Sequence, residues 1–293
     1  MLDLIPPVLV NGCAIALVAL GFHLVIRSTG GIVDFAIGQY AIIAGLAAAL
    51  ISSELHLPTI FVVALGCLAS IVVALLDEVA VIRPAILLNR DPLAMAPVLA
   101  TVSLLMVWEQ VARLVFGDFP LRGPSFLPGV RYSIGEIPIP AHSVVIVVTT
   151  VLVFLAVQLW LDRTKAGRML RAIGDNRLAA QLLGFSVNRS RALAFMLAGA
   201  TVGIAGGLIS PLAGFGALGG GYYTLNGFVA LFLGGVASPA GAFLGGIVLE
   251  AIKIAVGRYL GSGYQDYLVL ALSLLVFAFR PQGILAKRKT RAA

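Results

Sequence analysis

Long runs of apolar residues follow one another along nearly the whole chain. A run of roughly 20 apolar residues is long enough for an α-helix to cross the hydrocarbon core of a bilayer. The pattern predicts nine spans, at 8–26, 36–52, 58–80, 93–116, 141–161, 191–213, 222–237, 240–257 and 266–280. We therefore expect an all-α, polytopic membrane protein with about nine transmembrane helices (eight to ten), forming a single transmembrane domain over residues 1–293.

Glycine makes several of these spans irregular. The short span 36–52 and the pair around Gly234 to Gly246 are candidates for broken or re-entrant helices. Gly199 and Gly203 stand four residues apart, and the same spacing recurs in neighbouring spans. Small residues at this spacing let two helix backbones approach closely, either within one chain or at a subunit interface.

Composition excludes a soluble domain. Hydrophobic residues make up 60% of the chain and charged residues 11%, and the mean hydropathy is +1.05. A soluble domain has about 25% charged residues. The net charge is +7, and the basic residues lie in short gaps between apolar runs. This distribution favours contact with membrane lipid and not with nucleic acid. Cys13 and Cys67 lie in apolar runs, as small packed side chains do, and not as a disulfide or metal pair.

The basic residues predict an orientation. Seven basic residues and two acidic residues lie between Asp162 and Arg191, and five more basic residues follow Phe279. Cytoplasmic segments carry the excess of lysine and arginine. We therefore expect a cytoplasmic loop at 162–190, a basic cytoplasmic tail at 281–293, and an N-out, C-in topology. Four predicted spans separate the loop from the tail, and an even number agrees with this orientation.

The cytoplasmic loop itself is amphipathic. Its sequence "RMLRAIGDNRLAAQLLGFS" predicts two short helices, with a break at Gly174, a cap at Asp175 or Asn176, and an end at Gly184. The second helix places four apolar side chains on one face: Leu178, Ala179, Leu182 and Leu183. Topology requires only charge, so this face needs a partner. The lipid surface, the cytoplasmic end of the bundle and another protein all remain open.

Four segments of the chain resemble one family of permeases, and a short stretch inside one of them resembles a motif of ABC-importer permeases in general. "AAQLLG" (179–184) resembles the A-A-x-x-x-G core of the EAA loop of ABC-importer permeases, although Leu178 stands where that loop usually has glutamate. The longer segments, in the expected order, resemble the branched-chain amino-acid (LIV-type) permeases. They are "GIVDFAIGQYAIIAGLAAAL", "GRMLRAIGDNRLAAQLLGFSVNRSRALAFMLAGATVGIAGGL", "FVALFLGGVASPAGAFLGGIVLEAI" and "FRPQGIL".

This resemblance implies a permease subunit of a bacterial inner-membrane ABC importer, which is not itself an enzyme. It implies a second, related permease as a heterodimer partner, two cytoplasmic ATPase subunits that bind ATP and Mg, and a periplasmic binding protein. The chain has no G-x-x-x-x-G-K-[ST] motif with which to hold ATP itself. The implied ATPase-coupling residues are Asp175, Asn176, Arg177, Leu178, Ala179, Ala180, Leu182, Leu183 and Gly184.

Two polar clusters beside glycine-rich breaks are candidates for the substrate pathway. Interrupted helices expose backbone groups only where they line a cavity or are covered by protein, and their ends hold charged groups in transporters. The candidates are Asp34, Gly38, Gln39, Tyr40, Tyr223, Thr224 and Asn226. The alternative is a close-packed helix crossing that glycine permits.

The other polar residues in the spans have structural explanations. We expect local ion pairs for Glu109–Arg113 and Glu250–Lys253, an interfacial position opposite Arg83 for Asp77 and Glu78, and a packed, hydrogen-bonded side chain for His23.

Branched-chain amino acids are the default solute. Ile37 and Gln39 stand where LIV-type permeases often have histidine and glutamate, and related permeases also carry urea, amides or carboxylates. The main alternative is an ion-coupled secondary transporter, for which Asp34 is the one reasonable coupling carboxylate. A membrane enzyme would need a polar catalytic cluster, and the sequence shows none.

Overall fold

A computed structural model describes residues 4–55, 57–88, 96–134, 137–236 and 238–279. The helices are α1 (Ile5–Thr29), α2 (Ile37–Glu54), α3 (Thr59–Asp77), α4 (Arg83–Leu88), α5 (Ala96–Phe116), α6 (Ala141–Arg163), α7 (Lys165–Asp175), α8 (Arg177–Leu182), α9 (Val187–Ala213), α10 (Gly220–Gly234), α11 (Pro239–Tyr259) and α12 (Tyr264–Phe279). A π-helical turn (Glu78–Ile82) joins α3 to α4, and β1 (Arg131–Ile134) pairs with β2 (Ile137–Pro140) in an antiparallel hairpin.

The predicted polytopic, all-α fold is confirmed. Within the described residues, seven helices are long and apolar enough to cross a membrane. One of them is the continuous helix that α3, the π-helical turn and α4 form together, and the other six are α1, α2, α5, α6, α9 and α11. The predicted spans 222–237 and 266–280 correspond to the shorter α10 and α12, of 15 and 16 residues. The predicted tail 281–293, and most of "FRPQGIL", lie outside the described residues.

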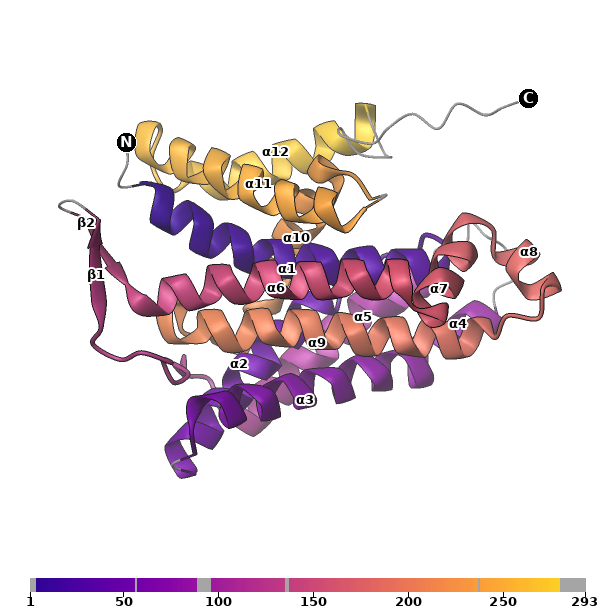
Figure 1. The fold of residues 1–293 in the computed structure, drawn as a ribbon, viewed down its shortest axis with the longest axis horizontal. Helices are drawn as coiled ribbons and strands as arrows, with labels where there is room; N and C mark the ends of the chain where they lie inside the picture. The colour runs from indigo at the N-terminus through magenta and orange to yellow at the C-terminus, as the bar shows by residue number, and fades with distance from the viewer. Residues whose placement is uncertain (1–3, 56, 89–95, 135–136, 237, 280–293) are drawn as a thin grey trace.

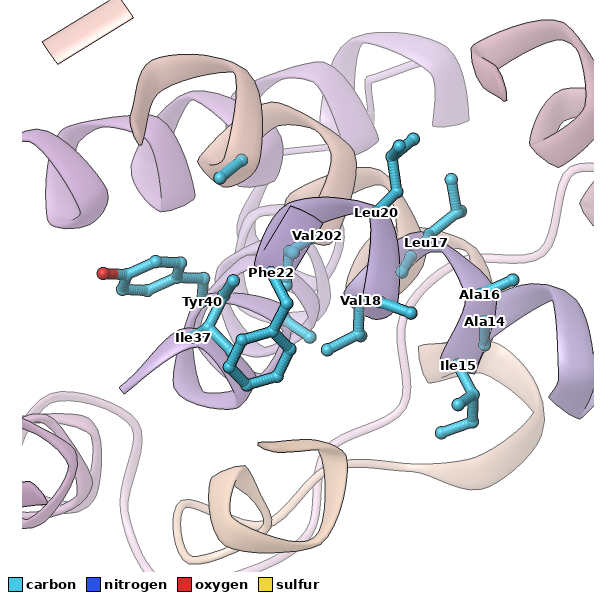
Figure 2. Packing of buried hydrophobic residues seen from close by; sticks show 14 of the residues in the cluster. Ala14, Ile15, Ala16, Leu17, Val18, Leu20, Phe22, Ile37, Tyr40 and Val202 are labelled. Atoms are coloured by element: carbon cyan, nitrogen blue, oxygen red, sulfur yellow. The ribbon is translucent and has the colours of Figure 1, made fainter. Parts of the chain in front are cut away.

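Helix α1 lies at the centre of the bundle. Its side chains from Cys13 to Val25 are buried on every side, which is typical of an apolar helix without a polar face. Figure 2 shows part of this packing, where Phe22 of α1 lies near Ile37 of α2 and Val202 of α9, and Leu17 and Ile15 lie further along α1. The surrounding helices are α9, α11, α10 and α6.

The glycine spacing serves packing within this chain. A Cβ on Gly199 of α9 would lie 2.9 Å from the Ile71 Cα and the Ser70 carbonyl oxygen of α3. A Cβ on Gly245 of α11 would collide with the Ala230 carbonyl of α10. These helix pairs therefore approach through their backbones, which answers the choice between intramolecular packing and a subunit interface for both sites.

The two ends of the bundle differ. The "loop end" carries α7, α8 and the last turn of α12, and the "hairpin end" carries β1, β2 and the start of α1 (Figure 1). The sequence pattern did not predict the hairpin. Near the hairpin end, the segment before it is tied to the bundle by two backbone hydrogen bonds between Leu121 and Phe215, of 2.9 and 2.8 Å. The predicted cytoplasmic loop and the last turn of α12 thus lie at the same end of the bundle.

Candidate functional site

The loop between α6 and α9 holds the two short helices that the sequence predicts, but the break expected at Gly174 is wrong, because α7 continues through Gly174 to Asp175. The Thr164 hydroxyl accepts a hydrogen bond from the Gly167 N–H at the start of α7, and Asn176 Oδ1 accepts one from the Ala179 N–H at the start of α8, each 3.0 Å long. Gly184, with φ of +81°, ends the second helix. The cap is Asn176, whereas Asp175 lies 3.4 Å from Arg27 and ties the loop to α1.

Helix α8 is anchored by one residue and displays three others. Ala180 is 2% exposed and packs with Ile173 of α7 and Val187 of α9. Leu178, Leu182 and Leu183 are 68%, 82% and 73% exposed. The three leucines therefore do not pack against the bundle, and their apolar surface remains for lipid or another protein. Ala179 is also exposed.

The two candidate pathway clusters meet in space. The Gly38 N–H donates to Thr224 Oγ1 (3.0 Å), and the Thr224 hydroxyl donates to the Phe35 carbonyl (2.9 Å). Gln39 Nε2 donates to the Ala217 carbonyl (2.8 Å). We call this contact between residues 34–40 and 217–224 the α2–α10 seam. A Cβ on Gly38 would collide with the Gly220 carbonyl, so glycine is required for the approach.

Asp34 stands where the chain enters α2. Its Oδ1 accepts from the Ala36 N–H (3.0 Å), and its Oδ2 accepts from the Tyr40 hydroxyl (2.7 Å). The same hydroxyl lies 2.8 Å from Asp77 Oδ2, and Trp108 Nε1 donates to Asp77 Oδ1 (2.6 Å). The interfacial position expected for Asp77 is wrong, because this side chain is 1% exposed and joins α2, α3 and α5. Its helical neighbours gave no sign of these partners.

Asn226 belongs to a different network. Its Oδ1 accepts from Lys253 Nζ (2.8 Å), and Lys253 also bonds Glu250 (2.7 Å) and the Tyr222 hydroxyl (2.7 Å). The predicted Glu250–Lys253 ion pair is confirmed. Because the network joins α10 to α11, the structure does not bring Asn226 into the α2–α10 seam. Tyr223, by contrast, packs edge-on against Phe215, 5.4 Å between ring centroids.

Glu78 makes a buried ion pair that sequence reasoning missed. Arg191 Nε of α9 lies 2.8 Å from Glu78 Oε1, and both side chains are 1% exposed. The expected interfacial position opposite Arg83 is therefore wrong for Glu78. The sequence pattern identifies Arg191 only as one of the basic residues that predict the topology. The one available signal was its position, at the point where the polar loop passes into an apolar run.

Three further expectations concern isolated side chains. Arg113 lies 2.9 Å from Asp118 instead of forming the expected ion pair with Glu109. His23 is packed as expected, with Nδ1 donating to the Val236 carbonyl (2.8 Å). Cys13 is buried, and Cys67 is partly buried.

Known permeases resemble this chain, two of them over nearly its full length. LivH of Salmonella typhimurium, a high-affinity branched-chain amino acid transport system permease protein, is 27% identical over 292 residues, covering 94% of this chain and 92% of LivH. BraD of Pseudomonas aeruginosa, described in the same words, is 29% identical and covers 95% of each chain. RbsC of Bacillus subtilis, a ribose import permease protein, is 30% identical over 58% of this chain and 52% of its own. No solved structure matches.

A family model supports the same assignment. The model describes the permease component of branched-chain amino acid transport systems, and it matches residues 5–279, which include every helix of the bundle. The relatives are permease subunits of ABC transporters and not catalytic enzymes. The chain therefore belongs to the family of branched-chain amino acid transport permeases and is a multi-pass permease subunit of the inner membrane.

Proposed function

We propose that this chain is the transmembrane subunit of an ATP-driven importer. Partner ATPases in the cytoplasm drive alternating access, and a small polar solute passes from periplasm to cytoplasm. The observation that carries the proposal is α8, a capped helix fixed by Ala180 that displays Leu178, Leu182 and Leu183 away from the bundle. A helix of this kind converts the movement of a docked ATPase into movement of α9, which follows directly.

A protein groove fits α8 better than lipid does. Interfacial helices bind membranes through an extended apolar face with basic residues beside it, and their affinity grows with the buried apolar area. Helix α8 has six residues, so its apolar face covers little area. Short amphipathic helices bind protein grooves through apolar anchors spaced as Leu178 and Leu182 are. The docking segment runs from Asp175 through Gly184.

The partners follow from the same role. The chain needs two ATPase subunits and a periplasmic binding protein that delivers the solute. It also needs a second, related permease, with which it forms a heterodimer. We assign the substrate route to the α2–α10 seam, since both interrupted segments meet there and polar groups are otherwise costly in a membrane. Its residues are Asp34, Gly38, Gln39, Tyr40, Tyr223 and Thr224, with Asn226 on the α11 side of α10.

The docking test is a double substitution in α8. Leu182→Asp with Leu183→Asp places two charges on the apolar face. These charges would have to lose their hydration when the helix docks, and this desolvation is costly. We expect substrate-stimulated ATP hydrolysis by the purified transporter to fall by about tenfold or more, as for central interface residues. The matched control is Gln181→Asp, which adds charge at an exposed position of the same helix without removing a leucine. Normal stimulated hydrolysis in the double variant would contradict the proposal.

The solute is tested separately. The similarity to LivH and BraD makes branched-chain amino acids the first candidate for the solute of this chain. The similarity to RbsC makes a sugar the second candidate, and urea, amides and carboxylates are further candidates. Uptake of labelled leucine, ribose and urea into cells that express the complete transporter distinguishes them. An ion-coupled carrier would instead purify without ATPase chains and would keep transporting after ATP depletion.

A further inference from the structure

A small polar cavity lies at the loop end of the bundle, among α1, α6, α7 and α11. Its volume is about 100 Å³. Its polar lining comes from His23 and Arg27 of α1, Gln158 of α6, Arg171 of α7, and Ser238 beside α11. Two of the five groups are guanidinium cations, and no carboxylate is among the described residues that line the cavity. The cavity is therefore suited to an anion.

An apolar groove opens into the same place. It has a volume of about 370 Å³ and runs between α6 and α11, along Leu155, Phe154, Phe243 and Ala240. The groove and the cavity share Gln158, Ser238 and Pro239 in their walls, so one continues into the other. Leu155 is 54% exposed, which places the groove on the outside of the bundle, where the membrane lies.

We propose that this combined site binds one anionic phospholipid of the cytoplasmic leaflet. The phosphate occupies the cavity against Arg171 and Arg27, and one acyl chain lies in the groove between α6 and α11. The site is separate from the α2–α10 seam and from the exposed leucines of α8, so it goes beyond the proposed transport function.

The arginines retain donors for a phosphate. Arg171 Nε is buried and has no hydrogen-bond partner among the described residues, while its Nη2 pairs with Asp162 outside the cavity. Arg27 Nη2 lies 3.4 Å from Asp175, beyond the 2.7–2.9 Å that is usual for a charge-assisted hydrogen bond. Neither aspartate is among the residues that line the cavity. Because Arg27 and Arg171 both line the cavity, their remaining guanidinium N–H groups can donate to a phosphate there.

The groove selects a lipid over a soluble phosphate. A free anion needs only the cavity, whereas the continuous apolar groove leaves room for a hydrocarbon chain. Cytoplasmic leaflets carry anionic lipids, and basic pockets between transmembrane helices bind their head groups. Because Leu170 and Arg171 of α7 form part of the cavity wall, a bound lipid would join α7 to α1, α6 and α11 and would steady the loop that carries α8.

The test measures lipid retention by the purified full-length chain with native mass spectrometry. Phosphatidylglycerol and phosphatidylethanolamine are titrated in turn. Arg171→Gln removes the head-group contact, and Ala240→Trp fills the groove without changing charge. Each should raise the half-saturating phosphatidylglycerol concentration by about tenfold, the size expected for one charge-assisted hydrogen bond or a blocked acyl site.

Matched controls separate a built site from general surface charge. Arg168→Gln makes the same charge change on α7 at an exposed position outside the cavity, and Leu244→Trp adds the same ring to α11 outside the groove. Both should retain phosphatidylglycerol like the unchanged chain, and phosphatidylethanolamine should bind more weakly. Glycerol 1-phosphate should not compete.

Four results would overturn the proposal. Equal loss in Arg168→Gln would mean diffuse charge attraction. Equal retention of phosphatidylglycerol and phosphatidylethanolamine would show that the site does not select an anionic head group. Full competition by glycerol 1-phosphate would make this a soluble-anion site. Unchanged lipid retention in Ala240→Trp, with loss of the second permease on co-purification, would assign the groove to that subunit.

Discussion

At the scale of single residues, the two carboxylate oxygens of Asp34 make two different kinds of contact, one local in the chain and one that leads to distant residues. One carboxylate oxygen accepts from the Ala36 N–H, as a residue that organises the start of α2 does, and the other accepts from Tyr40. The first contact is local and follows from the sequence position. The Tyr40–Asp77–Trp108 contacts join residues more than 30 positions apart, and only folding reveals them.

Substitution of Asp34 distinguishes a pathway role from a structural one. If its charge faces the solute, Asp34→Ala should reduce uptake while expression and assembly with the ATPases stay normal, since a charge is kept in a membrane mainly for function. Asp34→Asn removes the charge but keeps an acceptor for the Ala36 N–H, and its amide can donate to the Tyr40 hydroxyl oxygen while that hydroxyl donates to Asp77. Retained transport in this variant would therefore assign a polar role. Loss of folding in Asp34→Ala would make the residue structural and would leave Tyr223 and Thr224 as the pathway candidates.

The buried Glu78–Arg191 pair should matter far more than an exposed pair. Glu78→Gln leaves the Arg191 cation uncompensated, and breaking a buried pair in this way costs about 3–5 kcal/mol. We expect a clearly lower melting temperature for the purified chain, and partial recovery in the double exchange Glu78→Arg with Arg191→Glu. Asp118→Asn is the control, because the Arg113–Asp118 pair is exposed and should not shift the melting temperature. Equal shifts in Glu78→Gln and Asp118→Asn would refute this account.

At the scale of helices, the sequence predicts what depends on neighbours in the chain. Apolar length located the spans, and the Asn176 cap and Gly184 located α8. The α2–α10 seam depends on residues 186 positions apart, such as Gly38 and Thr224, and no periodicity encodes that contact. The sequence did not predict the hairpin, because Pro138 and Pro140 weaken the strand pattern of β2. In the structure, β2 nevertheless pairs with β1 in a regular antiparallel register.

Two glycines of the seam region provide a matched pair of substitutions. Gly38→Ala would drive a methyl group into the Gly220 carbonyl, and a backbone atom cannot move aside cheaply. Gly221→Ala meets nothing within 4 Å and adds helix propensity in α10. We expect a lower melting temperature and loss of uptake in the first variant and neither effect in the second. Tolerance of Gly38→Ala would show that the seam is looser than its hydrogen bonds indicate.

At the scale of the whole molecule, the ends of the bundle carry the topology. The basic loop and the end of α12 leave the bundle at the loop end, and the segment with Ser125 lies towards the hairpin end (Figure 1). The positive-inside rule makes the loop end cytoplasmic. The rule acts through the membrane, so the helix packing alone does not decide which end faces the cytoplasm.

Cysteine labelling decides the orientation. In a chain with Cys13 and Cys67 replaced by alanine, a cysteine at Ser125 should react with an impermeant thiol reagent added to intact cells with a permeable outer membrane, and one at Ser186 should not. Both positions are at least partly exposed, so access to the reagent is controlled by the membrane. Reaction at Ser186 alone would invert the topology and place α8 out of reach of a cytoplasmic ATPase. Reaction at both would mean that α6, which lies between them, does not cross the bilayer.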